Sequence, residues 1–227
     1  MSKLVWDSIG EKTYETGVSK AVLYPVVGAA YPKGFAWNGV TGVTESPSGA
    51  EATKLYANNG VYLSLYSAED LGVTLTAYMY PDEFKECDGS SELTPGVTAG
   101  QQERKAFGLS YQTIIGSDTD GNSYGYKIHL IYGCKASPSE RAYTTVNDSP
   151  EANEFSWELT TTPVSVTGKK STAILTIDST KVDKDALAAF EDILYGTESD
   201  EARLPLPDEV TNFFKTFTKT PESHNVG

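Results

Sequence analysis

The sequence has few cysteines and histidines and little positive charge. It contains two cysteines and two histidines, with no Cys-x-x-Cys pair and no Cys/His cluster, so the spacing that a structural zinc site needs is missing. Residues 1–12 also lack the apolar core of a secretion signal. We therefore expect synthesis in the cytoplasm, Cys87 and Cys134 as reduced thiols, and neither metal nor cofactor.

The charge balance excludes one class of function and permits another. Against 31 acidic residues stand 18 basic ones, which gives a formal net charge of −13. Nucleic-acid binding depends on Lys and Arg displacing counterions from phosphates, so we do not expect specific DNA binding. A surface that DNA must slide past can be repulsive, however, and the charge leaves a DNA conduit possible. No apolar run approaches eighteen residues, so we expect no membrane span.

The motifs of the common enzyme mechanisms are also missing. Neither GxxxxGK[ST] nor GxGxxG occurs, and His129 is the only histidine before the polar tail at 218–227. His129 lies among alternating polar residues, so we expect a solvated surface histidine. The carboxylate pairs Asp82/Glu83 and Glu201/Asp208 match glycosidase acids no better than chance among so many acidic residues. We expect no enzymatic activity.

Strand-forming residues dominate what is present. Fourteen tyrosines, many at alternate positions in Thr- and Val-rich runs, favour strands. The clearest pattern is at residues 104–135, where two long alternating runs flank a polar loop. In the first, Phe107 and Leu109 alternate with small residues, and in the second Ile128 and Leu130 alternate with small or basic ones. This pattern predicts a pair of strands with one buried face and one wet face.

Turn-forming and helix-capping residues along the chain predict the other elements. Asn38-Gly39 between apolar residues indicates a hairpin, residues 44–50 a connection, and residues 86–103 a long loop. Residues 52–56, 61–80, 141–146 and 155–159 are expected to be extended, and Pro81 to begin a single helical turn. Residues 183–195 have an apolar helical stripe with Asp183 as N-cap, and a short helix is expected near Pro207. We therefore predict one mainly β domain over residues 1–217, a β-sandwich or β-barrel with a flanking helix and a long loop. Residues 218–227 would form a disordered tail.

Two local patterns leave minor alternatives open. Residues 118–122, DTDGN, resemble part of an acidic calcium loop, but the carboxylate expected several residues later is missing, which favours a plain hairpin loop. Four tyrosines on predicted strand faces could stack on sugar rings, although such tyrosines more often pack against a neighbouring layer: Tyr62, Tyr66, Tyr78 and Tyr80. A carbohydrate-binding β-sandwich on a phage or cell surface is the alternative function.

Longer segments resemble a known family. The runs GQQERKAFGLSYQT from residue 100, GYKIHLIYGCKASPSERAYTTVNDSPEANEFSWELTTTP from residue 125, LTIDSTKVDKDALAAFEDILYGTE from residue 175 and RLPLPDEV from residue 203 resemble the major tail proteins, or tail tube proteins, of long-tailed phages and prophages of Gram-positive bacteria. These runs cover most of residues 100–210. The stretch before Val61 and the polar tail are largely outside the resemblance.

The resemblance implies a structural virion protein. Members of the family form a β-sandwich flanked by a helix and assemble as hexameric rings that stack into a hollow tube, through which DNA passes on ejection. The expected partners are other copies of the chain, the tape measure protein, the tail-tip or baseplate proteins and the tail terminator. The expected location is the virion tail tube, assembled in the host cytoplasm. Ring closure would also pair sheet edges that a monomer must protect.

We assign candidate positions on this basis. The candidates for the bore lining are the small, polar or basic alternates of residues 104–135: Gly108, Ser110, Gln112, Gly125, Lys127 and His129. The candidates for contacts between rings lie in two loops: Glu86, Asp88, Thr94, Gln101, Glu103, Asp118, Asp120 and Asn122. Lys127 and Lys135 do not fit a repulsive bore. Either the ring brings carboxylates such as Glu158 close to them, or the wet face lies elsewhere.

Overall fold

The computed structural model describes residues 4–146, 148 and 151–217. These contain strands β1 (Thr13–Pro25), β2 (Phe35–Ala36), β3 (Val40–Gly49), β4 (Ala52–Ala57), β5 (Gly60–Tyr66), β6 (Glu69–Ala77), β7 (Ser91–Thr94), β8 (Val97–Ala99), β9 (Phe107–Ser117), β10 (Gly121–Ala136), β11 (Phe155–Thr160) and β12 (Ile174–Asp178), the short 3₁₀-helix η1 (Asp82–Phe84), and helices α1 (Lys184–Tyr195) and α2 (Pro207–Thr216).

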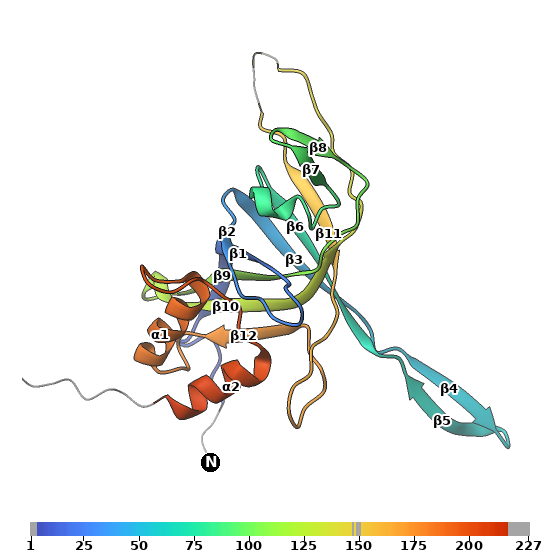
Figure 1. Ribbon diagram of the computed structural model, residues 1–227. Coiled ribbons are helices and arrows are strands. Elements are labelled where there is room, and N and C mark those ends of the chain that lie inside the picture. Colours follow the sequence, from blue (N-terminus) through green and yellow to red (C-terminus); the bar gives the residue numbers. More distant parts are fainter. Residues whose placement is uncertain (1–3, 147, 149–150, 218–227) are drawn as a thin grey trace, which may run out of the picture.

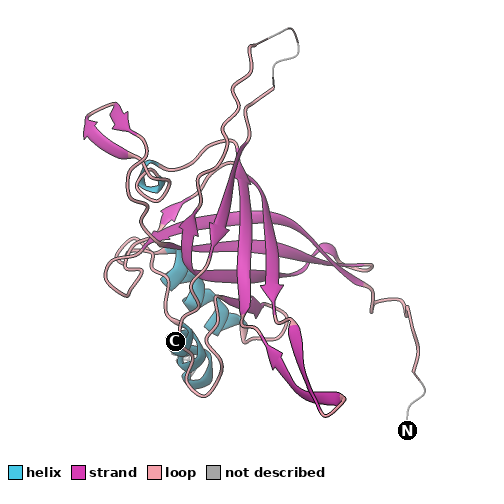
Figure 2. Cartoon of the chain, turned by 90° about the vertical axis from the view of Figure 1, so that its right-hand side faces the viewer, coloured by secondary structure: helices cyan, strands magenta, loops and turns pink. Residues whose placement is uncertain are grey.

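Eight strands form one large sheet that folds back on itself. Its strand order is β2-β1-β9-β10-β11-β6-β3, and β12 adds to the side of β10. All of its pairings are antiparallel. The strands of the two halves, β1-β9-β10 and β3-β6-β11, run in different directions and cross over one another (Figure 2). The sheet therefore encloses its own core, as the two sheets of a sandwich do.

Strand β10 joins the two halves because it changes partners along its length. Residues 127–131 pair with β12, whereas Lys135 and Ala136 pair with β11. Between them the register with β9 shifts, and Gly133 has a φ of 61°. A Cβ at Gly133 would lie 2.4 Å from the carbonyl oxygen of Thr162. Such a bulge, with glycine at the left-handed position, lets one strand turn the corner between two sheets.

The core between the two halves is mainly aromatic. Trp157 of β11 lies at its centre and is 1% exposed. Its ring lies 5.6 Å from that of Trp37 and 5.2 Å from that of Phe84, with steep interplanar angles. Edge-to-face packing of this kind adds to the free energy gained from burial. The short η1 helix belongs to this core because Phe84 is completely buried.

A second core lies on the opposite face of β1, β9, β10 and β12, where α1 and α2 cover the sheet (Figure 1). Phe190 of α1 is fully buried there, beside Ile128 and Leu130 of β10. Asp183 caps α1 as predicted, since its Oδ1 accepts hydrogen bonds from the backbone N–H of Asp185 at 3.0 Å and Ala186 at 3.1 Å. The central parts of β9 and β10, around Ser110 and Leu130, are therefore covered on both faces.

The predicted mainly β fold with a flanking helix is confirmed, and four local expectations are wrong. Asn38-Gly39 does not connect a hairpin, because β2 pairs with β1 while β3 pairs with β6. Residues 44–50 are mostly strand β3, residues 86–103 contain the β7–β8 hairpin, and residues 141–146, expected to be extended, form no strand. The predicted tail at 218–227 lies outside the described residues. Neither α-helix described has the length and apolar character needed to cross a membrane.

Candidate assembly surfaces

Three of the predicted bore residues are buried inside the subunit. Ser110 is completely buried, with its Oγ 3.2 Å from the hydroxyl of Tyr24, and Gln112 is 6% exposed. A Cβ on Gly108 would lie 2.4 Å from a methyl carbon of Leu204. Leu204 and Tyr31 pack against Gly108, and Tyr24, which bonds to the backbone of Leu194 in α1, packs against Ser110, so there is room only for small residues at these two positions. The prediction that Gly108, Ser110 and Gln112 face a bore is therefore wrong.

The strand register separates the remaining candidates from these three. Ser110 pairs with Leu130, and Tyr111 pairs with His129, so even positions of β9 share a face with even positions of β10. Lys127 and His129 therefore lie on the face opposite Ser110. The prediction placed even residues of β9 and odd residues of β10 on one wet face, which this register does not allow. Gly125 is half-buried.

His129 is a buried member of an ionic cluster, not the solvated histidine predicted. It is 8% exposed and stacks on Tyr111, with 4.7 Å between ring centroids and 4° between planes. Its Nε2 lies 3.5 Å from a carboxylate oxygen of Glu15, and its Nδ1 lies 3.4 Å from one of Glu45. The ammonium of Lys127 also pairs with Glu15. This cluster connects β1, β3, β9 and β10.

Burial and the neighbouring charges act in opposite directions on the pKa of His129 and on that of Glu15. Burial lowers the pKa of His129 below its ordinary value of 6.5, although the carboxylates of Glu45 and Glu15 oppose the shift. Partial burial alone would raise the pKa of Glu15, but hydrogen bonds from Lys127 and Thr113 and the charge of Lys127 lower it overall. Near neutral pH the cluster therefore holds ionised Glu15 beside a neutral imidazole.

The cluster superficially resembles a Thr-His-Glu triad. Thr113 Oγ1 lies 3.0 Å from His129 Nε2, but it donates its proton to Glu15 at 2.6 Å. A nucleophilic hydroxyl must hand its proton to the imidazole. The direction of this hydrogen bond favours a structural role for the cluster.

The predicted contact residues between rings fall into two separate places. On the segment that carries β7 and β8, four of them are exposed: Glu86, Thr94, Gln101 and Glu103. Asp88 is 8% exposed and pairs with Arg141, whose guanidinium also lies 5.5 Å from the ring centroid of Tyr80. Asp88 therefore anchors the segment after β10 to the body, and its predicted role as a surface contact is wrong.

The other predicted contacts lie at the β9–β10 turn. Asp118, Asp120 and Asn122 are all exposed there. Asp118 accepts a hydrogen bond from the backbone N–H of Gly10 at 3.0 Å, and Asn122 accepts one from the hydroxyl of Tyr14 at 2.9 Å. In the described part of the chain, no three metal-ligating side chains gather here or elsewhere. These contacts favour the plain hairpin loop over a calcium site.

A continuous wet face does exist, on the outside of the other half of the sheet. Register places Thr44 of β3, Thr74 of β6 and Glu158 of β11 side by side, and their neighbours Glu45, Val73 and Leu159 point inward. We call the outward-facing set the polar face: Thr41, Thr44, Ser46, Ser48, Asp70, Gly72, Thr74, Thr76, Lys135, Ser156, Glu158 and Thr160. It is made of small hydroxyl residues and glycine, with two carboxylates and one lysine. The alternation in residues 71–80 and 155–160 was its signal in the sequence.

An unpaired edge borders the polar face. Among the described residues, β3 pairs only with β6, so one side of this ten-residue strand keeps its backbone N–H and C=O groups free of strand pairing. A long exposed edge is a template for pairing with another chain. Pro47 is the one residue on the strand that cannot donate a backbone hydrogen bond.

The hairpin of β4 and β5 projects from the end of the β3–β6 pair, well away from the rest of the molecule (Figure 1). The chain turns into it at Gly49 and Ala50, with φ of 86° and 54°. A Cβ at Gly49 would lie 2.2 Å from the carbonyl oxygen of Ala68, so only glycine fits this bend.

The surface of this hairpin is unusually apolar for an exposed ribbon. Its large side chains are 43–76% exposed: Leu55, Tyr56, Val61, Tyr62, Leu63, Leu65 and Tyr66. An isolated two-stranded hairpin is marginal in water, and contiguous exposed apolar surface commonly marks an interaction site. A second exposed apolar stretch lies at the start of the described chain, where Leu4, Val5, Trp6 and Ile9 are 70–90% exposed. These two segments were not predicted as contacts.

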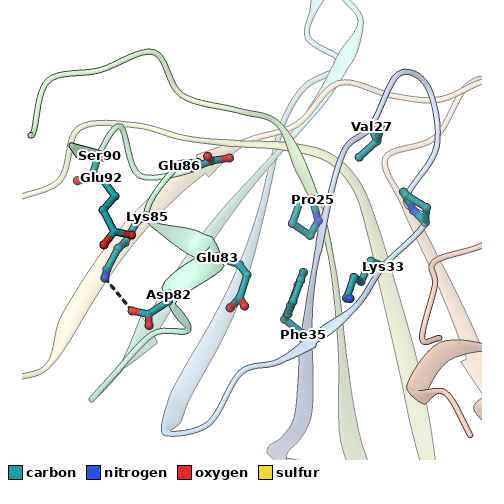
Figure 3. Close-up of a pocket in the computed structure, with 11 residues that line it drawn as sticks. Pro25, Val27, Lys33, Phe35, Asp82, Glu83, Lys85, Glu86, Ser90 and Glu92 are labelled. Carbon is teal, nitrogen blue, oxygen red and sulfur yellow. Dashed lines mark ion pairs between the residues drawn. The ribbon is translucent and has the colours of Figure 1, made fainter. Parts of the chain in front are cut away.

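An open pocket lies between the connection from β1 to β2 and the segment from η1 to β7 (Figure 3). Val27 and Phe35 contribute apolar surface, and Glu83 projects between η1 and Phe35. Lys85 pairs with Asp82 at 2.8 Å across the same rim. Asp82 and Glu83, a carboxylate pair whose match to glycosidase acids is no better than chance, thus lie on an open rim.

The residues of the alternative functions are dispersed. Glu201 pairs with Lys33 at 2.8 Å, whereas Asp208 accepts a hydrogen bond from the backbone of Thr167. Among the tyrosines proposed to stack on sugars, Tyr62 and Tyr66 lie on the hairpin. Tyr78 is exposed just after the end of β6, and the ring centroid of Tyr80 lies 5.6 Å from that of Trp157 in the core. These tyrosines do not form one platform.

No protein-family model matches the chain, and no curated protein is significantly similar to it.

Proposed function

We propose that the protein is the structural subunit of a phage tail tube, in which hexameric rings stack into a conduit for DNA. The proposal assigns no catalysis to the chain. Its proposed partners are other copies of itself, the tape measure protein inside the tube, and the tail-tip and terminator proteins at its ends. The proposed location is the virion tail.

The observation that carries the proposal is the polar face of β3, β6 and β11. Hydroxyl side chains bind water but carry no charge, and Asp70 and Glu158 repel phosphates. Lys135 is the one cation among the twelve residues of this face. A wall of this composition gives DNA few sites to bind, which is what a conduit requires. The polar face replaces β9–β10 as the proposed bore lining.

The free edge of β3 supports a closed ring. When each copy pairs this edge with an edge of its neighbour, the rotation can close and no edge remains exposed. The polar faces of successive copies would then join into one continuous inner surface. The contact is head-to-tail around the ring, so each copy uses two different surfaces.

Assembly at high concentration tests the proposal. Purified protein should form rings or tubes in negative-stain electron microscopy, with a central hole, and sedimentation velocity should show large species that increase with concentration. A sample that stays monomeric across the soluble concentration range, with and without tail-tip components, would count decisively against a tube subunit.

A further inference from the structure

The β4–β5 hairpin cannot reach the η1 pocket of its own subunit. The hairpin directly precedes β6, and η1 directly follows it. Strand β6 has nine residues, which span about 30 Å at roughly 3.3 Å per residue. The hairpin and η1 therefore lie at opposite ends of the β3–β6 pair, as β4–β5 and the short teal helix after β6 do in Figure 1, and η1 lines the pocket with Asp82 and Glu83. A contact between them has to join two copies.

The hairpin and the pocket are complementary in character. The hairpin offers the exposed rings of Tyr62 and Tyr66 on the face that also carries Lys54, and the pocket offers Val27 and Phe35. Docking would remove apolar surface on both sides from water, at about 25 cal/mol per Å² buried. It would also support a ribbon that lacks packing of its own, since all of β4 is exposed.

Charge is complementary as well. Lys54 is the only charged residue between Ala52 and Tyr66, and it makes no hydrogen bond or ion pair within the described part of the chain. The pocket carries four carboxylates, from Asp82, Glu83, Glu86 and Glu92, against two lysines, and both lysines already have acidic partners. Glu83 itself makes no hydrogen bond or ion pair with any described residue. A cationic hairpin and an acidic pocket thus each lack a partner.

We propose that the β4–β5 hairpin of one copy docks into the η1 pocket of a copy in the next ring, with Lys54 facing Glu83. This inference rests on the proposed tube function and names the contact that stacks its rings. The contact uses two different surfaces at opposite ends of the subunit. It therefore repeats without closing and gives an open-ended stack.

A charge swap tests the pairing of Lys54 with Glu83. Lys54→Glu and Glu83→Lys should each raise the concentration needed for tubes at least severalfold, because each places like charges together. The double variant should recover most of the loss, and Lys54→Arg, which keeps the charge, should behave like the wild type. Single variants without effect, or a double variant worse than both, would overturn the pairing.

Crosslinking tests the contact itself. Copies with Tyr62→Cys, on the face that carries Lys54, and copies with Val27→Cys are mixed, assembled and treated with a short bismaleimide, and the native Cys87 and Cys134 give little background because both are buried. A crosslinked dimer should form in the mixture and not in either variant alone. Wild-type tubes with no such dimer would overturn the inference and leave the tube function standing. Wild-type protein that forms neither rings nor tubes would overturn both.

Discussion

Two faces of the same sheet have nearly the same kind of sequence and opposite environments. On β9, Gly108, Ser110 and Gln112 are small or polar and lie buried against the helical layer. On β6 and β11, Thr74 and Ser156 are equally small and polar and face outward. The difference lies in what covers each strand: β9 is covered on both faces, and the β3–β6–β11 half on one. Small side chains mark close packing on one face and water on the other.

The largest expected effect comes from the residue that separates the two faces. Gly133→Val should destabilise the fold by roughly 2–5 kcal/mol, because a β-branched residue at positive φ is strained and its Cβ would clash with Thr162. Chemical denaturation measures this loss. Gly72→Ala on the polar face is the control and should cost about 1 kcal/mol or less. Similar losses for the two variants would show that the corner at Gly133 is not specifically required.

A matched pair of substitutions compares the two faces directly. Ser110→Leu should cost about 1–3 kcal/mol, because it overpacks a closed site and removes a partner of the Tyr24 hydroxyl. Thr74→Leu should change the free energy of unfolding of the monomer by less than about 0.5 kcal/mol. Urea denaturation of both variants provides the measurement. If Thr74→Leu proves the more damaging, the assignment of the two faces is reversed.

Helix α1 can be destabilised by a substitution that lies neither on the buried face of β9 nor on the polar face. Asp183→Ala removes the N-cap of α1 and should cost about 1 kcal/mol. Hydrogen exchange should then increase in α1 and in the part of β12 beneath it, and exchange in β6 and β11 should change little. Asp183→Asn, which keeps a capping oxygen, is the control. An equal increase in all strands would mean that the two halves of the sheet unfold as one unit.

The smallest effect is expected from the pH dependence of the His129 cluster. The folded state lowers the pKa of His129 below 6.5, so stability is fully present above pH 6.5 and is lost as pH falls towards the folded-state pKa. Below about pH 4.5 the lowered pKa of Glu15 adds a further loss. His129→Gln should flatten the stability profile just below pH 6.5 and leave the loss that Glu15 causes below about pH 4.5. An unchanged profile would show that His129 titrates alike in the folded and unfolded states.

Local patterns in the sequence were enough for the class of fold and for most elements. The helix from Asp183, the turn at Pro81 and the long strands of residues 104–135 follow from capping, proline and alternation. Local patterns could not predict which face each strand presents to solvent. It depends on the β9–β10 register and on the corner at Gly133, which brings β11 beside β10, and both are contacts between distant residues. The β4–β5 hairpin was predicted as strands, but nothing in its sequence showed that it leaves the body.

The most direct test asks which face becomes enclosed on assembly. Ser156→Cys on the polar face and Asn212→Cys on α2 both place an exposed thiol on the subunit, against native cysteines that are buried. Both variants should react with a bulky polyethylene glycol maleimide as monomers. In assembled tubes the thiol at 156 should become strongly protected while the thiol at 212 keeps reacting. Protection at 212 with free reaction at 156 would contradict a bore lined by β3, β6 and β11.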